Sequence, residues 1–158
     1  MLQQLVANGS VSAVNGTAFA VTPALRESYA EGDEDELADV ALREAALASV
    51  RLLAGAAGDA AAEQRPRRAV LVIEAEGATL RPDLDDAVVR LSGPVAIGDV
   101  VAAYVDNEAA ESAVLAAIDA VDAADLGDED AELTVGDAQD HDLAWYAPQE
   151  LQFLLDLL

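Results

Sequence analysis

The stretch that most constrains the fold is residues 34–54, "EDELADVALREAALASVRLLA", which predicts one long helix. Asp33 precedes it as a candidate N-cap, and three acidic residues in the first turn complement the positive end of the helix dipole. On a 3.6-residue period, one broad apolar face is formed by Leu37, Ala41, Leu42, Ala45, Ala48, Leu52 and Leu53. Because further apolar residues flank a narrow polar wedge, we expect this helix to pack between a sheet and another element.

Several short runs predict the strands of that sheet. The run "AVLVI" (69–73) is continuously apolar, which is typical of a central strand buried on both faces. Further strands are expected at 17–21, 87–91 and 100–105. Thr22 and Pro23 begin a short helix after the first of these strands, and "VAIGD" (95–99) fits one helical turn. A second main helix is expected over 108–126, followed by Gly127 as its C-cap glycine.

The C-terminal part of the chain is expected to form a hairpin and a helix. "AELTV" (131–135) and "HDLAWY" (141–146) have strand character, and the polar stretch between them suggests a loop. Pro148 is suited to the first position of the final helix. That helix carries an apolar stripe, which we expect to dock on the domain or on another chain: Leu151, Leu154, Leu155 and Leu158.

Together these elements predict an α/β (or α+β) fold. We expect a single-layer mixed sheet of about five strands packed against the two main helices, with the C-terminal hairpin and helix completing it. A chain of 158 residues has the size of one ordinary domain, so residues 1–158 are expected to form a single acidic globular domain. Within it, "AGAAGDAAAEQRPRR" (54–68) has the composition of a flexible connector.

The charge of the chain is strongly negative and unevenly distributed. Fifteen of the 31 carboxylates lie in residues 1–90 with all eight basic residues, which are arginines, whereas residues 91–158 hold the other 16 and no Lys or Arg. A net charge of -23 repels phosphate, so we expect neither nucleic-acid nor anionic-membrane binding. Three interpretations stay open: plain solubility, adaptation to high salt, and an acidic face for a basic partner.

Composition also removes most catalytic chemistry. The chain has one histidine, no cysteine and no lysine, which excludes thiol nucleophiles, lysine mechanisms and His-rich or Cys-bearing zinc sites. Neither a phosphate-binding glycine loop nor a Gly-x-Ser-x-Gly elbow is present. Without cysteine, a secretory leader or an apolar stretch of roughly 20 residues, the chain is expected to be cytoplasmic.

One candidate metal site surrounds the single histidine. Its oxygen and imidazole ligands would suit a divalent cation: Asp137, Asp140, His141 and Asp142. The alternative is that Asp residues cap turns in a polar loop before a strand.

A carboxylate run offers a second candidate. Asp125, Asp128, Glu129, Asp130 and Glu132 follow the second main helix. Paired carboxylates can do general acid–base work when burial separates their pKa values, although a contiguous run is more typical of a solvated face or of a partner-binding surface.

The basic cluster Arg65, Arg67 and Arg68 is a candidate anion site, with help from Arg81 or Arg90. It can equally neutralise neighbouring acids.

Trp145 and Tyr146 point to opposite faces of a regular strand. A lone tryptophan in a chain with so few aromatics is expected in the core, and the alternative is an exposed interface anchor.

Five stretches resemble an uncharacterised actinobacterial domain-of-unknown-function family: "TAFAVTPALRESYA", "ALREAALASVRLLA", "AVVRLSGPV", "DAADLGDEDAE" and "DLAWYAPQEL". The resemblance covers most of the chain and implies no activity. It also implies a short N-terminal strand of the form Met-Arg-Val-Tyr-apolar-Pro before "LQQLVANG", and this sequence lacks that strand. An exposed sheet edge is therefore expected near residues 69–73 or 17–21.

The pattern as a whole favours a non-catalytic protein-binding or structural module, with no cofactor, that engages a basic protein partner or forms a homo-oligomer. Two alternatives stay open: a carboxylate-dependent divalent-metal hydrolase that uses the 137–142 loop, and a salt-adapted housekeeping domain.

Overall fold

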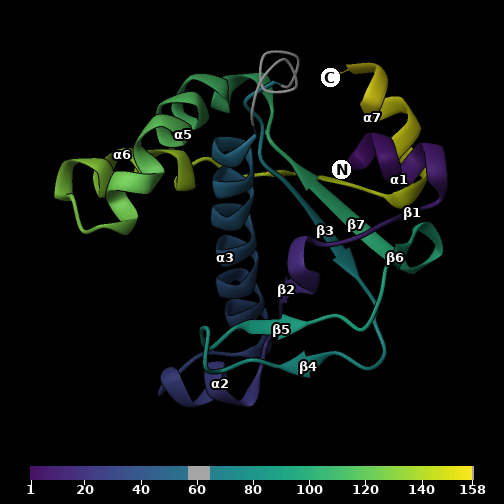
Figure 1. Cartoon of the computed structure of the whole chain (residues 1–158), viewed down its shortest axis with the longest axis horizontal. Helices are drawn as coiled ribbons and strands as arrows, with labels where there is room; N and C mark the ends of the chain where they lie inside the picture. The colour runs from purple at the N-terminus through teal and green to yellow at the C-terminus, as the bar shows by residue number, and fades with distance from the viewer. Residues whose placement is uncertain (57–64, 158) are drawn as a thin grey trace. The chain divides into compact units, whose positions relative to one another are not determined.

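Figure 1 shows the computed structural model of the chain, which describes residues 1–56 and 65–157. The described chain divides into two compact units: unit 1 comprises residues 1–45, 71–103 and 147–157, and unit 2 comprises the remaining described residues. The helices are α1 (Leu2–Asn8), α2 (Pro23–Ser28), α3 (Glu34–Gly55), α5 (Glu111–Asp125), α6 (Glu129–Gln139) and α7 (Leu151–Leu157). The strands are β1 (Ser10–Val11), β2 (Thr17–Phe19), β3 (Ala69–Ile73), β4 (Thr79–Leu80), β5 (Val88–Arg90), β6 (Val95–Ala96), β7 (Val100–Val105) and β8 (Ala144–Tyr146).

Unit 1 contains two small antiparallel sheets. In the first, β1 pairs with β6 so that Val11 lies opposite Val95. In the second, β5 lies between β2 and β4, and Val89 is paired with Ala18 on one side and Leu80 on the other. Short 3-10 turns follow β1 (Val14–Gly16) and β6 (Ile97–Asp99). The helical turn expected from "VAIGD" is confirmed only for its last three residues, because Val95 and Ala96 form β6.

The helices of unit 1 follow the predicted capping and stripe patterns. The Thr22 side chain accepts a hydrogen bond from the Leu25 backbone N–H at 3.1 Å, with Pro23 at the first helical position of α2. Helix α7 packs against α1, and Leu151 and Leu154 are both buried. The C-terminal leucine stripe therefore docks on its own chain within unit 1, although Leu158 lies outside the described residues.

Unit 2 is built around the antiparallel pair of helices α5 and α6, drawn in green in Figure 1. Its buried cluster joins small residues of both helices with Ala110, which precedes α5, and Val50 of α3. The residues from the two helices are Val114, Ala117, Val121, Val135 and Ala138. The predicted strand at 131–135 is wrong, because this segment forms the middle of α6. Asp128 caps α6 by accepting from the Ala131 N–H at 2.9 Å, and the helical spacing of Ala131, Val135 and Ala138 buries one face.

The strands β3, β7 and β8 form a third sheet in the order β3-β7-β8. The predicted boundaries of 69–73 and 100–105 are confirmed, but the central strand is β7. The placement of "AVLVI" as a central strand is wrong, since β3 lies at an end of its sheet and Val72 is exposed. Both segments expected to offer a sheet edge, β3 and β2, are end strands.

Helix α3 begins as predicted, with the Asp33 carboxylate accepting from the Glu36 N–H at 2.9 Å. The single apolar face predicted for it is wrong in its second half, where Val50 is fully buried and Leu52 is exposed. The reason is that Leu37 and Val40 pack in the buried cluster of unit 1, whereas Val50 packs in that of unit 2. The helix also includes the first two residues of the expected 54–68 connector, whose residues 57–64 lie outside the described chain.

The mixed α/β class is thus confirmed, and the single five-stranded sheet is corrected to three small sheets within the described residues. The predicted C-terminal hairpin is replaced by α6 followed by the strand β8. A single domain over 1–158 stays a prediction. Among the described residues, no helix is long and apolar enough to cross a membrane.

Candidate functional site

The segment around the single histidine is a helix end rather than a hairpin loop. Asp137 lies in the last turn of α6, Asp140 follows it as the C-cap, and both side chains are exposed. His141 is half-buried and Asp142 is exposed. Within residues 1–56 and 65–157, no group of three or more His, Asp or Glu side chains is placed to hold a metal ion.

The strongest polar arrangement in unit 2 is a buried ion pair next to this segment. Arg68 and Asp106 are each 1% exposed, and the guanidinium donates from Nε and Nη2 to the two carboxylate oxygens at 2.9 and 2.8 Å. The Arg68 backbone N–H also donates to the Asp106 carboxylate at 2.7 Å, and the Asp106 N–H donates to the Arg68 carbonyl at 3.0 Å. Side chain and backbone together therefore lock the start of β3 to the end of β7.

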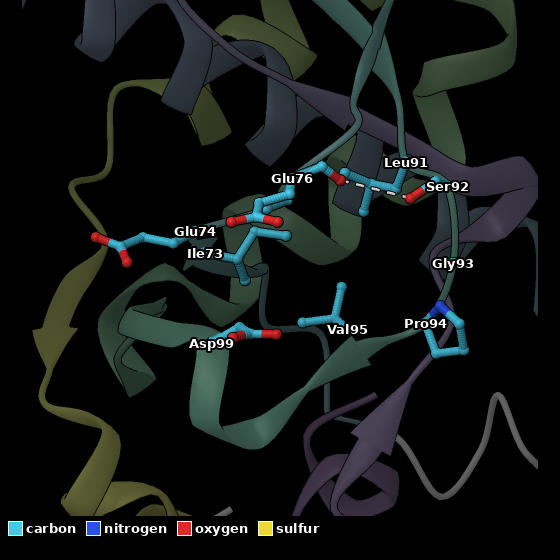
Figure 2. A pocket seen from close by; sticks show the side chains of 10 residues that line it. Ile73, Glu74, Glu76, Leu91, Ser92, Gly93, Pro94, Val95 and Asp99 are labelled. Carbon is cyan, nitrogen blue, oxygen red and sulfur yellow. Dashed lines mark hydrogen bonds between the residues drawn. The ribbon is translucent and has the colours of Figure 1, made fainter.

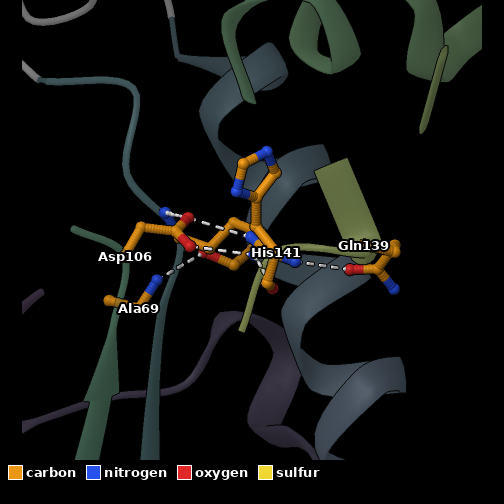
Figure 3. Close-up of polar contacts among 6 residues, drawn as sticks. Ala69, Asp106, Gln139 and His141 are labelled. Atoms are coloured by element: carbon orange, nitrogen blue, oxygen red, sulfur yellow. Dashed lines mark hydrogen bonds and ion pairs between the residues drawn. The ribbon is translucent and has the colours of Figure 1, made fainter. Parts of the chain in front are cut away.

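The same guanidinium fixes the end of α6 (Figure 3). Arg68 Nη1 donates to the Gln139 side-chain oxygen at 2.9 Å, and Nη2 donates to the backbone carbonyl of His141 at 2.7 Å. Four guanidinium hydrogen bonds are thus made by a group that has five N–H donors. Figure 3 shows the imidazole pointing away from the ion pair, so the network holds the backbone of His141 and leaves its ring out.

The predicted anion site is therefore largely committed to carboxylates of the chain itself. Arg68 is paired with Asp106, and Arg67 donates to Glu111 at 2.8 Å. Arg65 is exposed, and Arg81 is paired with Asp83 at 2.7 Å in unit 1. An anion site at this cluster stays a prediction without support from the geometry.

The predicted carboxylate run forms part of an exposed acidic surface on α5 and α6. Glu129, Asp130 and Glu132 are exposed in the first turn of α6, and Asp119 and Asp122 are exposed on α5. We call these five residues the acidic surface.

Residues next to the acidic surface make more specific contacts. Asp128, which is also exposed, is the N-cap of α6. Arg51 donates to Asp125 at 2.9 and 3.0 Å, and this hydrogen bond holds the pKa of the Asp125 carboxyl below its usual range. Two leucines interrupt the acids: Leu126 is 90% exposed and Leu133 is 69% exposed.

The two aromatic side chains of β8 point to opposite faces, as expected for a strand, and the outward-pointing one is the tryptophan. Trp145 is 57% exposed and Tyr146 is half-buried. The expectation that Trp145 lies in the core is wrong, because the alternation of the strand places its neighbours inward instead. The alternative prediction, that Trp145 anchors an interface, requires an exposed indole.

Sequence reasoning missed a cleft of about 440 Å³ in unit 1, shown in Figure 2. Ile73, Leu91 and Val95 line it together with the carboxylates of Glu76 and Asp99. In Figure 2 the Glu74 side chain points away from these two, so the three acids do not converge. The Ser92 hydroxyl in its wall donates to the Glu76 carbonyl at 3.5 Å rather than to a base. The only sequence signal was the acidic "EAE" that follows β3.

Comparison with models of protein families shows the family of this chain. The model of DUF6912, described as a family of unknown function, matches residues 1–155. No curated protein and no solved structure matches the chain.

Proposed function

Because the chain belongs to DUF6912, a family of unknown function, we propose its function from its own surface. We propose that it is a non-catalytic protein-binding module with a basic protein partner. The observation that carries the proposal is the acidic surface of α5 and α6, whose five carboxylates are all exposed. Opposite charge on a partner would steer its approach and set its orientation.

The use of arginine in unit 2 supports this proposal. Arg51, Arg67 and Arg68 each pair with a carboxylate of the same unit. These arginines therefore neutralise Asp125, Glu111 and Asp106, and the acidic surface keeps its charge for an external cation. The exclusion of nucleic acid belongs to the same proposal, because a net charge of -23 repels polyanions. A cytoplasmic location is also part of the proposal, because a chain without cysteine fits a reducing compartment.

The two alternatives receive less support. A divalent-metal hydrolase needs converging ligands, and the described residues hold no group of three or more suited to a metal. It would be favoured if millimolar Mn²⁺ or Mg²⁺ raised the melting temperature. A salt-adapted domain would be favoured by stability that climbs steeply up to molar salt.

A titration with a labelled oligolysine peptide tests the proposal. The affinity is measured by fluorescence anisotropy at about 0.15 M salt, where exposed charges act only over about 8 Å. We expect the triple variant Asp119→Asn, Asp122→Asn, Glu129→Gln to bind several times more weakly than the unmodified chain.

The matched control removes the same charge elsewhere. Glu31, Asp35 and Asp39 are exposed residues of unit 1, and Asp35 also lies in the first turn of a helix. The variant Glu31→Gln, Asp35→Asn, Asp39→Asn loses equal charge, and we expect it to keep most of the affinity. Equal weakening by both triple variants would show that only total charge matters, and the proposal would then be wrong.

A further inference from the structure

The outer side of α5 carries apolar and acidic side chains in a regular order. Leu115, Asp119 and Asp122 are separated by four and three residues, so they lie on one side of the helix. Leu126 follows Asp122 by four residues as the C-cap residue that ends α5. All four are exposed, Leu115 to 54% and Leu126 to 90%. We call these residues the α5 stripe.

The packing of unit 2 does not account for the two leucines of the α5 stripe. Helix α5 packs in unit 2 through Val114, Ala117 and Val121, which lie on its other side. Single exposed leucines are common on protein surfaces. Here, however, one leucine lies on each side of two exposed carboxylates. A binding partner with apolar and basic groups in the same order could contact all four residues.

The turn after α5 presents Leu126 in a fixed position. The Leu126 N–H donates to the Ala123 carbonyl at 3.1 Å, and the Gly127 N–H donates to the Ala124 carbonyl at 3.0 Å. Gly127 has a φ of 94°, a left-handed conformation that favours glycine. Because the backbone at the turn is hydrogen-bonded, binding would require little further ordering of the backbone at Leu126.

The chemistry of the α5 stripe selects one kind of occupant. The leucines favour apolar side chains, and Asp119 and Asp122 between them favour cations. A helix that carries apolar, basic, basic and apolar residues at positions i, i+4, i+7 and i+11 matches both requirements. A second copy of this chain that docked through its own α5 stripe would fit poorly, since Asp119 and Asp122 would meet like charges.

We propose that the α5 stripe is the docking face for an amphipathic basic helix of a partner protein. This inference rests on the proposed function and specifies its surface and its partner. The apolar residues of the partner helix cover Leu115 and Leu126, and its two basic residues pair with Asp119 and Asp122.

Two synthetic peptides of equal composition test the inference. The stripe peptide is an alanine-based helix with Leu, Lys, Lys and Leu at i, i+4, i+7 and i+11, and the scrambled peptide places the same residues on different faces. Fluorescence anisotropy at about 0.15 M salt measures both affinities. We expect the stripe peptide to bind about tenfold more tightly, or better, because only it buries both leucines while pairing both charges.

Variants of the chain locate the contact. The double variants Leu115→Ser, Leu126→Ser and Asp119→Asn, Asp122→Asn should each weaken the stripe peptide about tenfold. The matched controls are the double variants Leu80→Ser, Leu84→Ser, at leucines of unit 1 that are 51% and 53% exposed, and Glu31→Gln, Asp35→Asn. These controls should leave the affinity unchanged, and an unaltered melting temperature shows that each variant is folded.

The outcomes separate the two proposals. If the two peptides bind equally and the leucine variant binds the stripe peptide as tightly as its control does, the α5 stripe is not the docking face. The proposed function would still hold if the acidic-surface variant selectively weakened the binding of oligolysine. If neither peptide nor oligolysine binds, both proposals fail.

Discussion

At the scale of single residues, Arg68 and Asp106 hold unit 2 together at a point that solvent does not reach. Removing two charges from water is costly, and the cost is offset only if the remaining donors and acceptors are also satisfied. Here the pair is bidentate, and the guanidinium makes further hydrogen bonds to Gln139 and His141. Breaking the pair on one side would leave the other charge buried without its partner.

The replacement Asp106→Ala should therefore lower the free energy of unfolding by about 3–5 kcal/mol. Urea denaturation of the variant beside the unmodified chain measures this loss. The control is Glu111→Gln, which alters the more exposed pair with Arg67 and should cost less than Asp106→Ala, because solvent reaches the Glu111 carboxylate. A loss below about 1 kcal/mol for Asp106→Ala would show that Arg68 finds other partners or water.

A second residue-scale prediction concerns pH. The hydrogen bond from Arg51 lowers the pKa of Asp125 in the folded chain, so the ion pair stabilises the fold above the pKa of the unfolded carboxyl, about 3.9. This contribution is lost as the pH falls through the lowered, folded pKa. Because both side chains are nearly half exposed, it should be smaller than about 1 kcal/mol.

The test compares urea midpoints of the unmodified chain and Asp125→Asn from neutral to acidic pH. The difference should be constant at neutral pH and vanish at the acidic end. A difference that grows on acidification would contradict the assigned sign of the pKa shift.

At the scale of elements, α6 shows how packing and capping override strand propensity. "AELTV" contains Thr and Val, which favour strands. The segment is helical because Asp128 caps its start and because Val135 and Ala138 share the face that is buried with α5. Small residues on that face allow the two helices to approach closely.

Loss of the cap should therefore weaken α6. We expect Asp128→Ala to lower the free energy of unfolding by about 1 kcal/mol, since the Ala131 N–H loses its acceptor. Thermal or urea unfolding measures the change. Asp137→Ala is the control, because Asp137 lies near the negative C-terminal end of the same helix, where removing an acid should be neutral or slightly stabilising. Equal destabilisation by both changes would contradict the role of the cap.

Elements specified by local pattern were predictable from the sequence. The bounds of α3 and β3 and the caps Asp33 and Thr22 follow from periodicity and from residue types next to each other in the chain. Asp128 is a typical N-cap residue and could have indicated the start of α6. The strand-like composition of 131–135 outweighed this signal in the sequence prediction.

Features that depend on distant parts of the chain were not predictable. Arg68 and Asp106 are 38 residues apart, and no local pattern marks them as partners. The exposure of Trp145 depends on which face of β8 is covered, which its own sequence does not specify. Among the proposed binding residues, the carboxylates in the first turn of α6 were candidates from the sequence, and their role stays a prediction. The residues of the α5 stripe became candidates only through their exposure.

At the scale of the whole molecule, the described chain divides into two units, each with its own buried cluster. Three elements, α3, β3 and β7, contain residues of both units. Melting one unit would therefore interrupt elements of the other, and we expect both to unfold together, as a single domain would.

Urea unfolding followed by two probes measures this cooperativity. Trp145 fluorescence reports on unit 2, and hydrogen exchange of the amides of Leu5 and Val89 reports on unit 1. Coincident transitions are expected for a two-state unfolding. Two separated midpoints would show instead that the units are independent folding domains.

The buried pair of Arg68 and Asp106 also has an evolutionary consequence. A change of either residue alone leaves a buried charge without its partner, so selection would eliminate most single substitutions at these positions. A simultaneous exchange of both for well-packed apolar residues avoids that intermediate. Across DUF6912, positions 68 and 106 should therefore be inherited as a unit, and a sequence that has lost one member of the pair should have lost the other as well.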